Sequence, residues 1–218
     1  AWLALKVAPN ASDIADIGSG IGTVGLLTLW NLSPAARLVM VEAQQISHQL
    51  ARKSIQANGL TDRVKARLGD LRDPSLFSAS EKFDLVTGTP PYFPVGTATA
   101  SAHPQRAACR MELRGSILDY ALTAAKLINE AGWFVCCHCA GDERTERAMT
   151  EAGLHIVHRC DVVFRAGKQP TIVLLACQKQ FVHKRVDLEP MIIRDENGFH
   201  TEQYLAARRL VGRPSKAE

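Results

Sequence analysis

Three closely spaced glycines follow a short apolar stretch near the start of the chain. Gly18, Gly20 and Gly22 come directly after Ile14–Ile17 and precede Thr23–Trp30, a run with helical character. Glycine lets the backbone turn tightly and lets a ligand touch the main chain. In open α/β sheets, ligands bind beyond the carboxyl ends of the strands, which is where such a loop would lie. The segment therefore predicts a strand, a ligand-binding loop and a helix.

Strand-like and helix-like segments alternate along most of the chain, which favours a sheet covered by helices on both faces. The last two predicted strands are separated only by Gly167–Pro170 and short flanks, so they should form an antiparallel hairpin. We predict a Rossmann-like α/β fold with a seven-stranded, mostly parallel sheet. Its strands would be Ile14–Ile17, Leu38–Val41, Val64–Leu68, Phe83–Thr87, Trp133–Ala140, Leu154–Val163 and Thr171–Cys177, and its helices Thr23–Trp30, Ile46–Ala57, Ile117–Ile128, Asp142–Ala152 and a segment from Thr201.

The length and composition suit one compact domain with a C-terminal appendage. The chain has 218 residues, of which 46% are hydrophobic and 22% charged. We predict that residues 1–180 form the main domain and that 181–218 form a basic extension beside it. Trp30 and Trp133 are expected in the core. No run approaches the ~20 apolar residues that a membrane span needs, so no membrane partner is expected.

The charged residues and cysteines set limits on the partners. The net charge of +4 is mild, but Arg106, Arg110 and Arg114 cluster in the middle of the chain. These arginines are candidates for the rim of the site, where they would meet phosphates, although a solvated face is the alternative. The six cysteines include Cys136 and Cys139 at metal-like spacing, but no second pair completes a zinc site. We expect free thiols in a reducing compartment such as the cytoplasm, and no metal.

Acidic residues end the first three predicted strands, and each has a role to offer to a bound cofactor. Glu42 lies about 20 residues beyond the glycines, where a carboxylate can accept both hydroxyls of a ribose. Asp70 and Leu71 follow the third strand and could face an adenine. Asp16 precedes the glycines, where it could orient the ammonium group of S-adenosylmethionine directly or through water.

A dinucleotide-binding dehydrogenase is the rival interpretation of this region. Gly20, Gly22 and Gly25 also match the dinucleotide fingerprint, with Glu42 as the ribose acid. Two features oppose it: Asp16 would place negative charge near a pyrophosphate, and the terminal hairpin departs from an all-parallel sheet. S-adenosylmethionine is therefore the favoured cofactor.

A second motif, Thr89-Pro90-Pro91-Tyr92-Phe93, follows the fourth predicted strand. Two prolines fix the backbone and hold the neighbouring carbonyl groups in place. An aromatic side chain after the turn can stack on a planar substrate, although either aromatic could instead fill a core pocket. Oxygen acceptors that grip the N–H groups of an exocyclic amine would free its lone pair and align it with a methyl donor.

The two motifs together resemble class I methyltransferases that carry Asn/Asp-Pro-Pro-Tyr/Phe and methylate exocyclic or amide nitrogens. Pro90-Pro91-Tyr92-Phe93 is most similar to bacterial tRNA adenine-N6 methyltransferases of the valine tRNA type, and the segment Pro190–Glu202 is similar to their closing strand. The family's upstream helix and entry segment would be missing or cut to Ala1–Leu5. The resemblance implies S-adenosylmethionine as cofactor and structured RNA as partner.

The resemblance also implies roles for particular residues. Cofactor binding would involve Asp16, Gly18, Gly20, Gly22, Glu42, Asp70, Leu71 and Thr89. Catalysis would involve Thr89, Pro90, Pro91 and Tyr92, and substrate binding Tyr92, Phe93, Arg106 and Arg110.

One residue departs from the family motif, because Thr89 stands where the family has Asn or Asp. A threonine hydroxyl can accept a hydrogen bond, but it is shorter and its own donor must point elsewhere. Catalysis could then rest on the backbone carbonyl of Pro90, or the enzyme could act on a different nitrogen, such as that of a protein amide or a small molecule. A degenerate homologue that binds the cofactor without activity is the third alternative.

Overall fold

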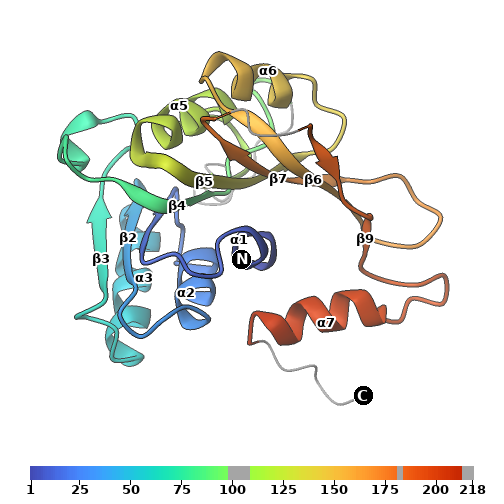
Figure 1. Cartoon of the computed structure of the whole chain (residues 1–218), viewed down its shortest axis with the longest axis horizontal. Coiled ribbons are helices and arrows are strands. Elements are labelled where there is room, and N and C mark those ends of the chain that lie inside the picture. The colour runs from blue at the N-terminus through green and yellow to red at the C-terminus, as the bar shows by residue number, and fades with distance from the viewer. Residues whose placement is uncertain (98–108, 181–183, 213–218) are drawn as a thin grey trace.

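The computed structural model describes residues 1–97, 109–180 and 184–212. Their strands form one sheet in the order β3-β2-β1-β4-β5-β7-β6-β8, with β9 paired to β6 (Figure 1). The strands are β1 (Asp13–Ile17), β2 (Arg37–Glu42), β3 (Val64–Leu68), β4 (Phe83–Gly88), β5 (Ile128–Cys139), β6 (His155–Val163), β7 (Ile172–Gln178), β8 (Val186–Asp187) and β9 (Met191–Ile192).

The predicted mixed sheet is confirmed. Strands β1 to β5 run parallel to one another, and β7 lies antiparallel between β5 and β6. The seven long strands are the predicted ones, and β8 and β9 add two short pairings to β6. Because β1, β2 and β4 are parallel neighbours, the loops that follow them meet at one edge of the sheet.

Helices cover both faces of the sheet. In Figure 1, α2 (Thr23–Trp30) and α3 (Gln45–Ala57) lie on one face with the short α1 (Trp2–Val7), while α5 (Ile117–Leu127) and α6 (Arg144–Glu151) lie on the other. Alternation along the strands divides the core accordingly, so that Ile14 packs on the α2 side and Ala15 on the α5 side. Across the described ranges, no helix combines the length and apolar character that a membrane span would require.

Three local expectations were wrong or incomplete. Helix α1 was not predicted, and Leu3 and Leu5 bury it in the core. Strand β5 begins at Ile128 rather than Trp133, because it continues through a bulge in which Phe83 pairs with Ile128 and Leu85 with Trp133. Trp30 is 72% exposed rather than part of the core, since it ends α2 at the molecular surface.

The C-terminal segment packs on the far end of the sheet. Thr201 caps α7 (Glu202–Leu210) by accepting a hydrogen bond from the Tyr204 amide. Ala207 of this helix shares a small buried cluster with Met191 of β9 and with Cys160 and Val162 of β6. The division into a domain at 1–180 and an extension at 181–218 stays a prediction.

A buried carboxylate joins three of these elements. Asp16 of β1 is only 2% exposed, and its Oδ2 accepts a hydrogen bond from the Gly25 amide of α2 at 3.0 Å. Its Oδ1 accepts one from the Thr87 hydroxyl of β4 at 2.8 Å. A Cβ at Gly25 would lie 2.9 Å from the Asp16 side chain, so only glycine lets the helix come this close. Burial raises the pKa of Asp16 to about 6, although both hydrogen bonds oppose the rise.

This burial predicts a pH dependence for the Asp16→Asn variant. The folded-state pKa lies above the unfolded value, so the wild type binds the proton more tightly when folded and loses stability as the pH rises from about 4 to about 6. Asparagine has no such titration and keeps an acceptor for Gly25. We expect the stability of the wild type relative to the variant to fall by roughly 1 kcal/mol per pH unit in this window. Urea unfolding of both proteins at a series of pH values measures it, and parallel pH profiles would contradict it.

Candidate active site

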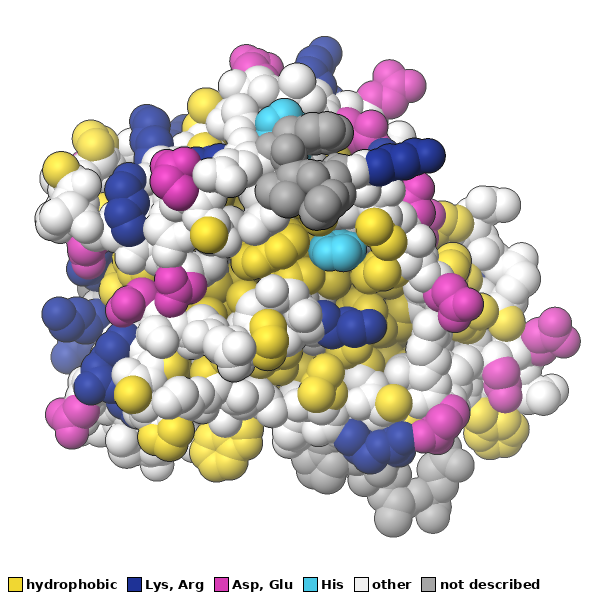
Figure 2. All heavy atoms as spheres, viewed as in Figure 1, with side chains coloured by type: hydrophobic (Ala, Val, Ile, Leu, Met, Phe, Trp, Pro, Cys, Tyr) yellow, Lys and Arg dark blue, Asp and Glu magenta, His cyan; other side chains and the backbone are white. Residues whose placement is uncertain are grey.

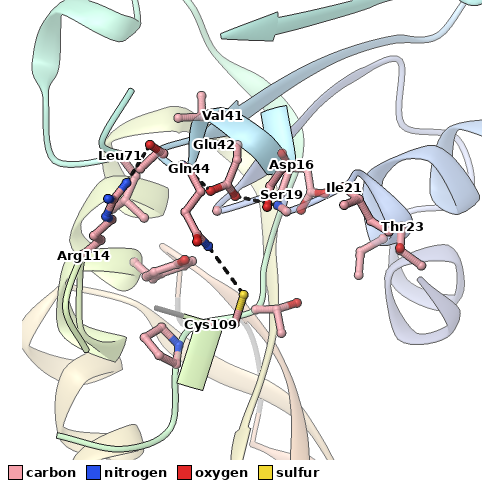
Figure 3. Close-up of a pocket in the computed structure, with 18 of the residues that line it drawn as sticks. Asp16, Ser19, Ile21, Thr23, Val41, Glu42, Gln44, Leu71, Cys109 and Arg114 are labelled. Atoms are coloured by element: carbon pink, nitrogen blue, oxygen red, sulfur yellow. Dashed lines mark hydrogen bonds between the residues drawn. The ribbon is translucent and has the colours of Figure 1, made fainter. Parts of the chain in front are cut away.

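A cavity of about 410 Å³ opens at the carboxyl ends of β1, β2 and β4. Figure 3 shows side chains that converge on it from the glycine loop, from the end of β2 and from the segment around Arg114. The predicted site residues Asp16, Gly18, Gly20, Glu42, Leu71, Thr89 and Pro91 all line it.

The glycines of the loop answer different constraints. Gly18 has φ +63°, and a Cβ there would lie 1.9 Å from the Tyr120 hydroxyl of α5. Gly20 has φ +58°, but nothing lies within 4 Å of its Cβ position. Gly22 is the N-cap of α2 and is not among the residues that line the cavity. Gly18 is therefore required by its close contact with Tyr120, whereas Gly20 leaves open space that a ligand can approach.

Glu42 holds the loop and the start of α3 together. Its carboxylate accepts hydrogen bonds from the Gly20 amide at 2.7 Å and from the Gln44 amide at 2.6 Å (Figure 3). Each carboxylate oxygen has two acceptor sites, so both oxygens can still receive a hydroxyl hydrogen from the cavity. This arrangement fits the predicted grip on a ribose.

After β3, where we predict the adenine, the chain reaches the cavity beside Asp70 rather than through it. Asp70 forms a bidentate pair with Arg72, with the closest N–O distance at 2.6 Å, and the hydrogen bonds from Arg72 lower its pKa. Asp70 is not among the described residues that line the cavity, whereas its neighbours Gly69 and Leu71 are. Leu71 thus offers an apolar surface to a planar ring.

The turn Thr89–Phe93 after β4, here called the acceptor turn, lines the cavity with Thr89 and Pro91. Gly88 of β4 pairs with Cys136 of β5, so the next residue, Thr89, lies beside Cys137. Burial raises the pKa of the Cys137 thiol, and contacts with the Tyr92 and Thr89 hydroxyls oppose the rise.

The remaining residues of the turn lie outside the cavity wall. Pro90 is buried, and Tyr92 is half-buried with its hydroxyl 3.3 Å from Cys137 Sγ. The Tyr92 ring packs edge-on against buried His138, with ring centroids 5.4 Å apart. Tyr92 is therefore held in place by Cys137 and His138 of β5.

Phe93 is fixed by backbone hydrogen bonds to the segment that follows residue 108. Its amide donates to the Arg110 carbonyl at 3.1 Å, and its carbonyl accepts from the Glu112 amide at 2.9 Å. The Arg110 guanidinium lies over the Phe93 ring, 5.6 Å from its centroid. These two predicted substrate contacts are thus adjacent, while Arg106 lies outside the described residues.

The cavity is also lined by residues that sequence reasoning did not assign to the cofactor, among them Gln44, Cys109, Arg114 and Tyr120. Arg114 donates to the Ala43 carbonyl at 2.6 Å, and the Gln44 amide group lies 3.5 Å from Cys109 Sγ (Figure 3). The segment from Cys109 to Arg114 therefore spans the cavity to the end of β2. Tyr120 had one signal in the sequence, a hydroxyl on the apolar face of an amphipathic helix.

The cavity fits S-adenosylmethionine better than a dinucleotide. Two carboxylates, Asp16 and Glu42, border it, and a pyrophosphate would be repelled by both. An ammonium group and a ribose are instead the partners that carboxylates favour. Within 1–97, 109–180 and 184–212, no group of three or more His, Cys, Asp or Glu side chains could hold a metal ion.

Comparison with known proteins agrees with this geometry. The family model "Methyltransferase small domain" matches residues 2–112. A protein of Histophilus somni named tRNA1(Val) (adenine(37)-N6)-methyltransferase is 26% identical over 197 residues, covering 89% of this chain and 80% of its own length. A protein of the same name from Cronobacter sakazakii is 30% identical over 169 residues, covering 77% and 67% respectively.

Solved structures share the fold at lower identity. A predicted O-methyltransferase from Agrobacterium tumefaciens superposes with a TM-score of 0.64 at 18% identity, covering 95% of this chain and 92% of its own. TrmN from Thermus thermophilus gives 0.58 at 17% identity, covering 82% and 47%. The matched model takes in the glycine loop, Glu42 and the acceptor turn. The chain belongs to the methyltransferase small domain family, whose cofactor is S-adenosylmethionine.

Proposed function

We propose that this enzyme transfers the methyl group of S-adenosylmethionine to N6 of an adenine in tRNA. The supporting observation is that Thr89 and Pro91 of the acceptor turn border the same cavity as Gly18, Gly20 and Glu42. The methyl donor and the amine would then lie next to each other in one cavity. The relatives named for adenine 37 of a valine tRNA supply the substrate class.

On the cofactor side, residues of the chain would bind S-adenosylmethionine and orient it. Glu42 receives the ribose hydroxyls while it keeps the Gly20 and Gln44 amides. Asp16 lines the floor, and although each of its oxygens already accepts one hydrogen bond, each keeps a second acceptor site for an ammonium group. Leu71 covers the adenine. The sulfonium supplies an activated methyl group when bound.

On the acceptor side, oxygen atoms grip the amine. The Thr89 hydroxyl and the backbone carbonyl of Pro90 accept the two N–H hydrogens of the amine. This directs the nitrogen lone pair at the methyl carbon. The hydrogen of the Thr89 hydroxyl can point to the Cys137 sulfur, so its lone pairs stay free for the amine. The amine becomes acidic after transfer and releases its proton to water, so no strong base is required.

The tRNA would approach over Phe93 and Arg110. An aromatic ring beneath a guanidinium offers both stacking and a phosphate contact at one place. On the face seen in Figure 2, Lys and Arg are interspersed with Asp and Glu rather than gathered into one basic patch. We expect recognition to use the contacts at Phe93 and Arg110, and an enzyme of tRNA would work in the cytoplasm.

The substrate is tested with tRNA transcripts. We expect methyl transfer to a valine tRNA that carries adenosine at position 37 and none to the same transcript with guanosine there, with N6-methyladenosine as the labelled nucleoside. Transfer should weaken steeply with salt, because phosphates contribute to RNA binding. Equal labelling of both transcripts would contradict the position. Labelling of protein or small molecules alone, with a flat salt response, would contradict the RNA substrate.

Glu42→Ala should weaken binding of S-adenosylmethionine at least tenfold, or about 1.4 kcal/mol. The variant loses the ribose acceptor and also leaves the Gly20 and Gln44 amides without theirs. Calorimetric titration of the cofactor measures the change. Glu151→Ala, at the exposed end of α6, is the matched control. Unchanged affinity in the Glu42 variant would place the ribose elsewhere.

Thr89→Val tests the acceptor role of the hydroxyl. Valine has the same shape without the oxygen, so one hydrogen bond of about 1 kcal/mol to the amine is lost and transfer should slow roughly fivefold. Cofactor affinity should change little, and Thr89→Ser should keep most of the rate. Single-turnover kinetics at saturating cofactor measure this. An inactive wild type together with an active Thr89→Asn variant would identify a degenerate homologue instead.

A further inference from the structure

The Arg144 guanidinium contacts the acceptor turn from outside the cofactor cavity. Its Nη2 donates to the Tyr92 carbonyl at 3.2 Å, and its Nη1 donates to Glu112 Oε1 at 2.7 Å. The Asp142 carboxylate accepts from Nε and Nη2, with the closest contact at 2.5 Å. The Arg144 side chain is only 30% exposed, so these interactions are partly shielded from water.

Together with a backbone bond, these contacts close a ring of interactions that runs through Tyr92, Phe93, Glu112 and Arg144. Arg144 holds the Tyr92 carbonyl and the Glu112 carboxylate, while the Glu112 amide donates to the Phe93 carbonyl at 2.9 Å. The consecutive carbonyl groups of Tyr92 and Phe93 are thus held by Arg144 and Glu112, which are bonded to each other. The planar fork of arginine can serve three acceptors at once in a fixed geometry, which a lysine ammonium cannot reproduce.

Helix α6 holds the turn at a second point. Thr145, the residue after Arg144, lies 2.8 Å from His138 Nδ1 through its hydroxyl oxygen. The His138 ring packs edge-on against Tyr92, and His138 is fully buried. The backbone and the ring of Tyr92 are therefore both positioned from the first turn of α6.

We infer that Arg144 is a positioning residue that fixes the acceptor turn, with Glu112 and Asp142 orienting its guanidinium. The inference rests on the proposed function, because the turn is taken to hold the amine. Arg144 is not among the residues that line the cofactor cavity. Its loss should therefore displace the acceptor without affecting the binding of the donor.

The test compares Arg144→Met with Arg147→Met, an exposed arginine of the same helix. At saturating cofactor and tRNA, the Arg144 variant should transfer methyl at least roughly tenfold more slowly, since displacement by about 1 Å can cost 10²-fold. Its affinity for S-adenosylmethionine should stay within about twofold, because the cavity wall is unchanged. Arg147→Met should match the wild type in both.

A second readout does not depend on activity. The Tyr92 hydroxyl lies 3.3 Å from Cys137 Sγ, so a released Tyr92 should let iodoacetamide alkylate Cys137 several-fold faster, as followed by peptide mass spectrometry. The alkylation rate of Cys137 in Arg147→Met is the reference. Glu112→Ala should behave like Arg144→Met, whereas Glu112→Gln, which keeps an acceptor oxygen, should retain most of the rate and the slow alkylation.

The outcomes separate this inference from the proposed function. Wild-type rates and unchanged Cys137 alkylation in Arg144→Met would overturn it. Equal loss of cofactor affinity and rate would also overturn it, because that pattern indicates general damage. If the wild type itself does not methylate tRNA, the proposed function fails and Cys137 alkylation alone decides the positioning role. If Arg144→Met does not fold, the Glu112 pair decides it.

Discussion

The buried carboxylate of Asp16 is the interaction on which the site depends. It links the end of β1 to the Gly25 amide of α2 and to the Thr87 hydroxyl of β4. The three elements around the glycine loop therefore share one polar centre. Burying a carboxylate is costly unless hydrogen bonds compensate it, and here two do. The loop between Asp16 and Gly25 lines the cavity with Gly18 and Gly20. Burial raises the pKa of Asp16 to about 6, so the ionised carboxylate lowers the stability of the fold at neutral pH while it holds this geometry.

The two halves of the site are held in different ways. The cofactor half is held by contacts near the strand ends: the Glu42 carboxylate accepts from the Gly20 and Gln44 amides, and positive φ at the glycines shapes the wall. The acceptor half is held by more distant elements, with Arg144 on the Tyr92 carbonyl, Cys137 on the Tyr92 hydroxyl and backbone bonds from Phe93 to Arg110 and Glu112. If the proposed site is right, changes that disturb the acceptor half should leave donor binding intact, so the two halves should be separable by mutation.

This difference explains what the sequence could and could not predict. The glycine loop and Glu42 are local patterns at strand ends, and strand order in a parallel sheet brings them together. Asp70 followed the same pattern, but an arginine two residues later takes its carboxylate. Trp30 seemed fit for the core by hydropathy, yet it ends α2 at the surface. Arg144 and Glu112 lie 32 residues apart, and no spacing rule links them. Local patterns predict the donor site, whereas the acceptor site depends on tertiary contacts.

The substitution at Thr89 gains a physical meaning from Cys137. A hydroxyl carries one hydrogen that needs an acceptor, and the register of β4 and β5 puts a sulfur beside it. The Tyr92 hydroxyl meets the same sulfur, so one thiol orients two hydroxyl groups of the turn. An asparagine would extend its carbonyl oxygen farther into the cavity than threonine can. Relatives with asparagine at this position and the present protein would align the amine with the same donor. The substrate base would then have to lie closer to the turn in the present protein, because the threonine oxygen reaches less far. This difference would lie on the acceptor side alone, because in the proposed binding mode Glu42 and the glycine loop hold the donor.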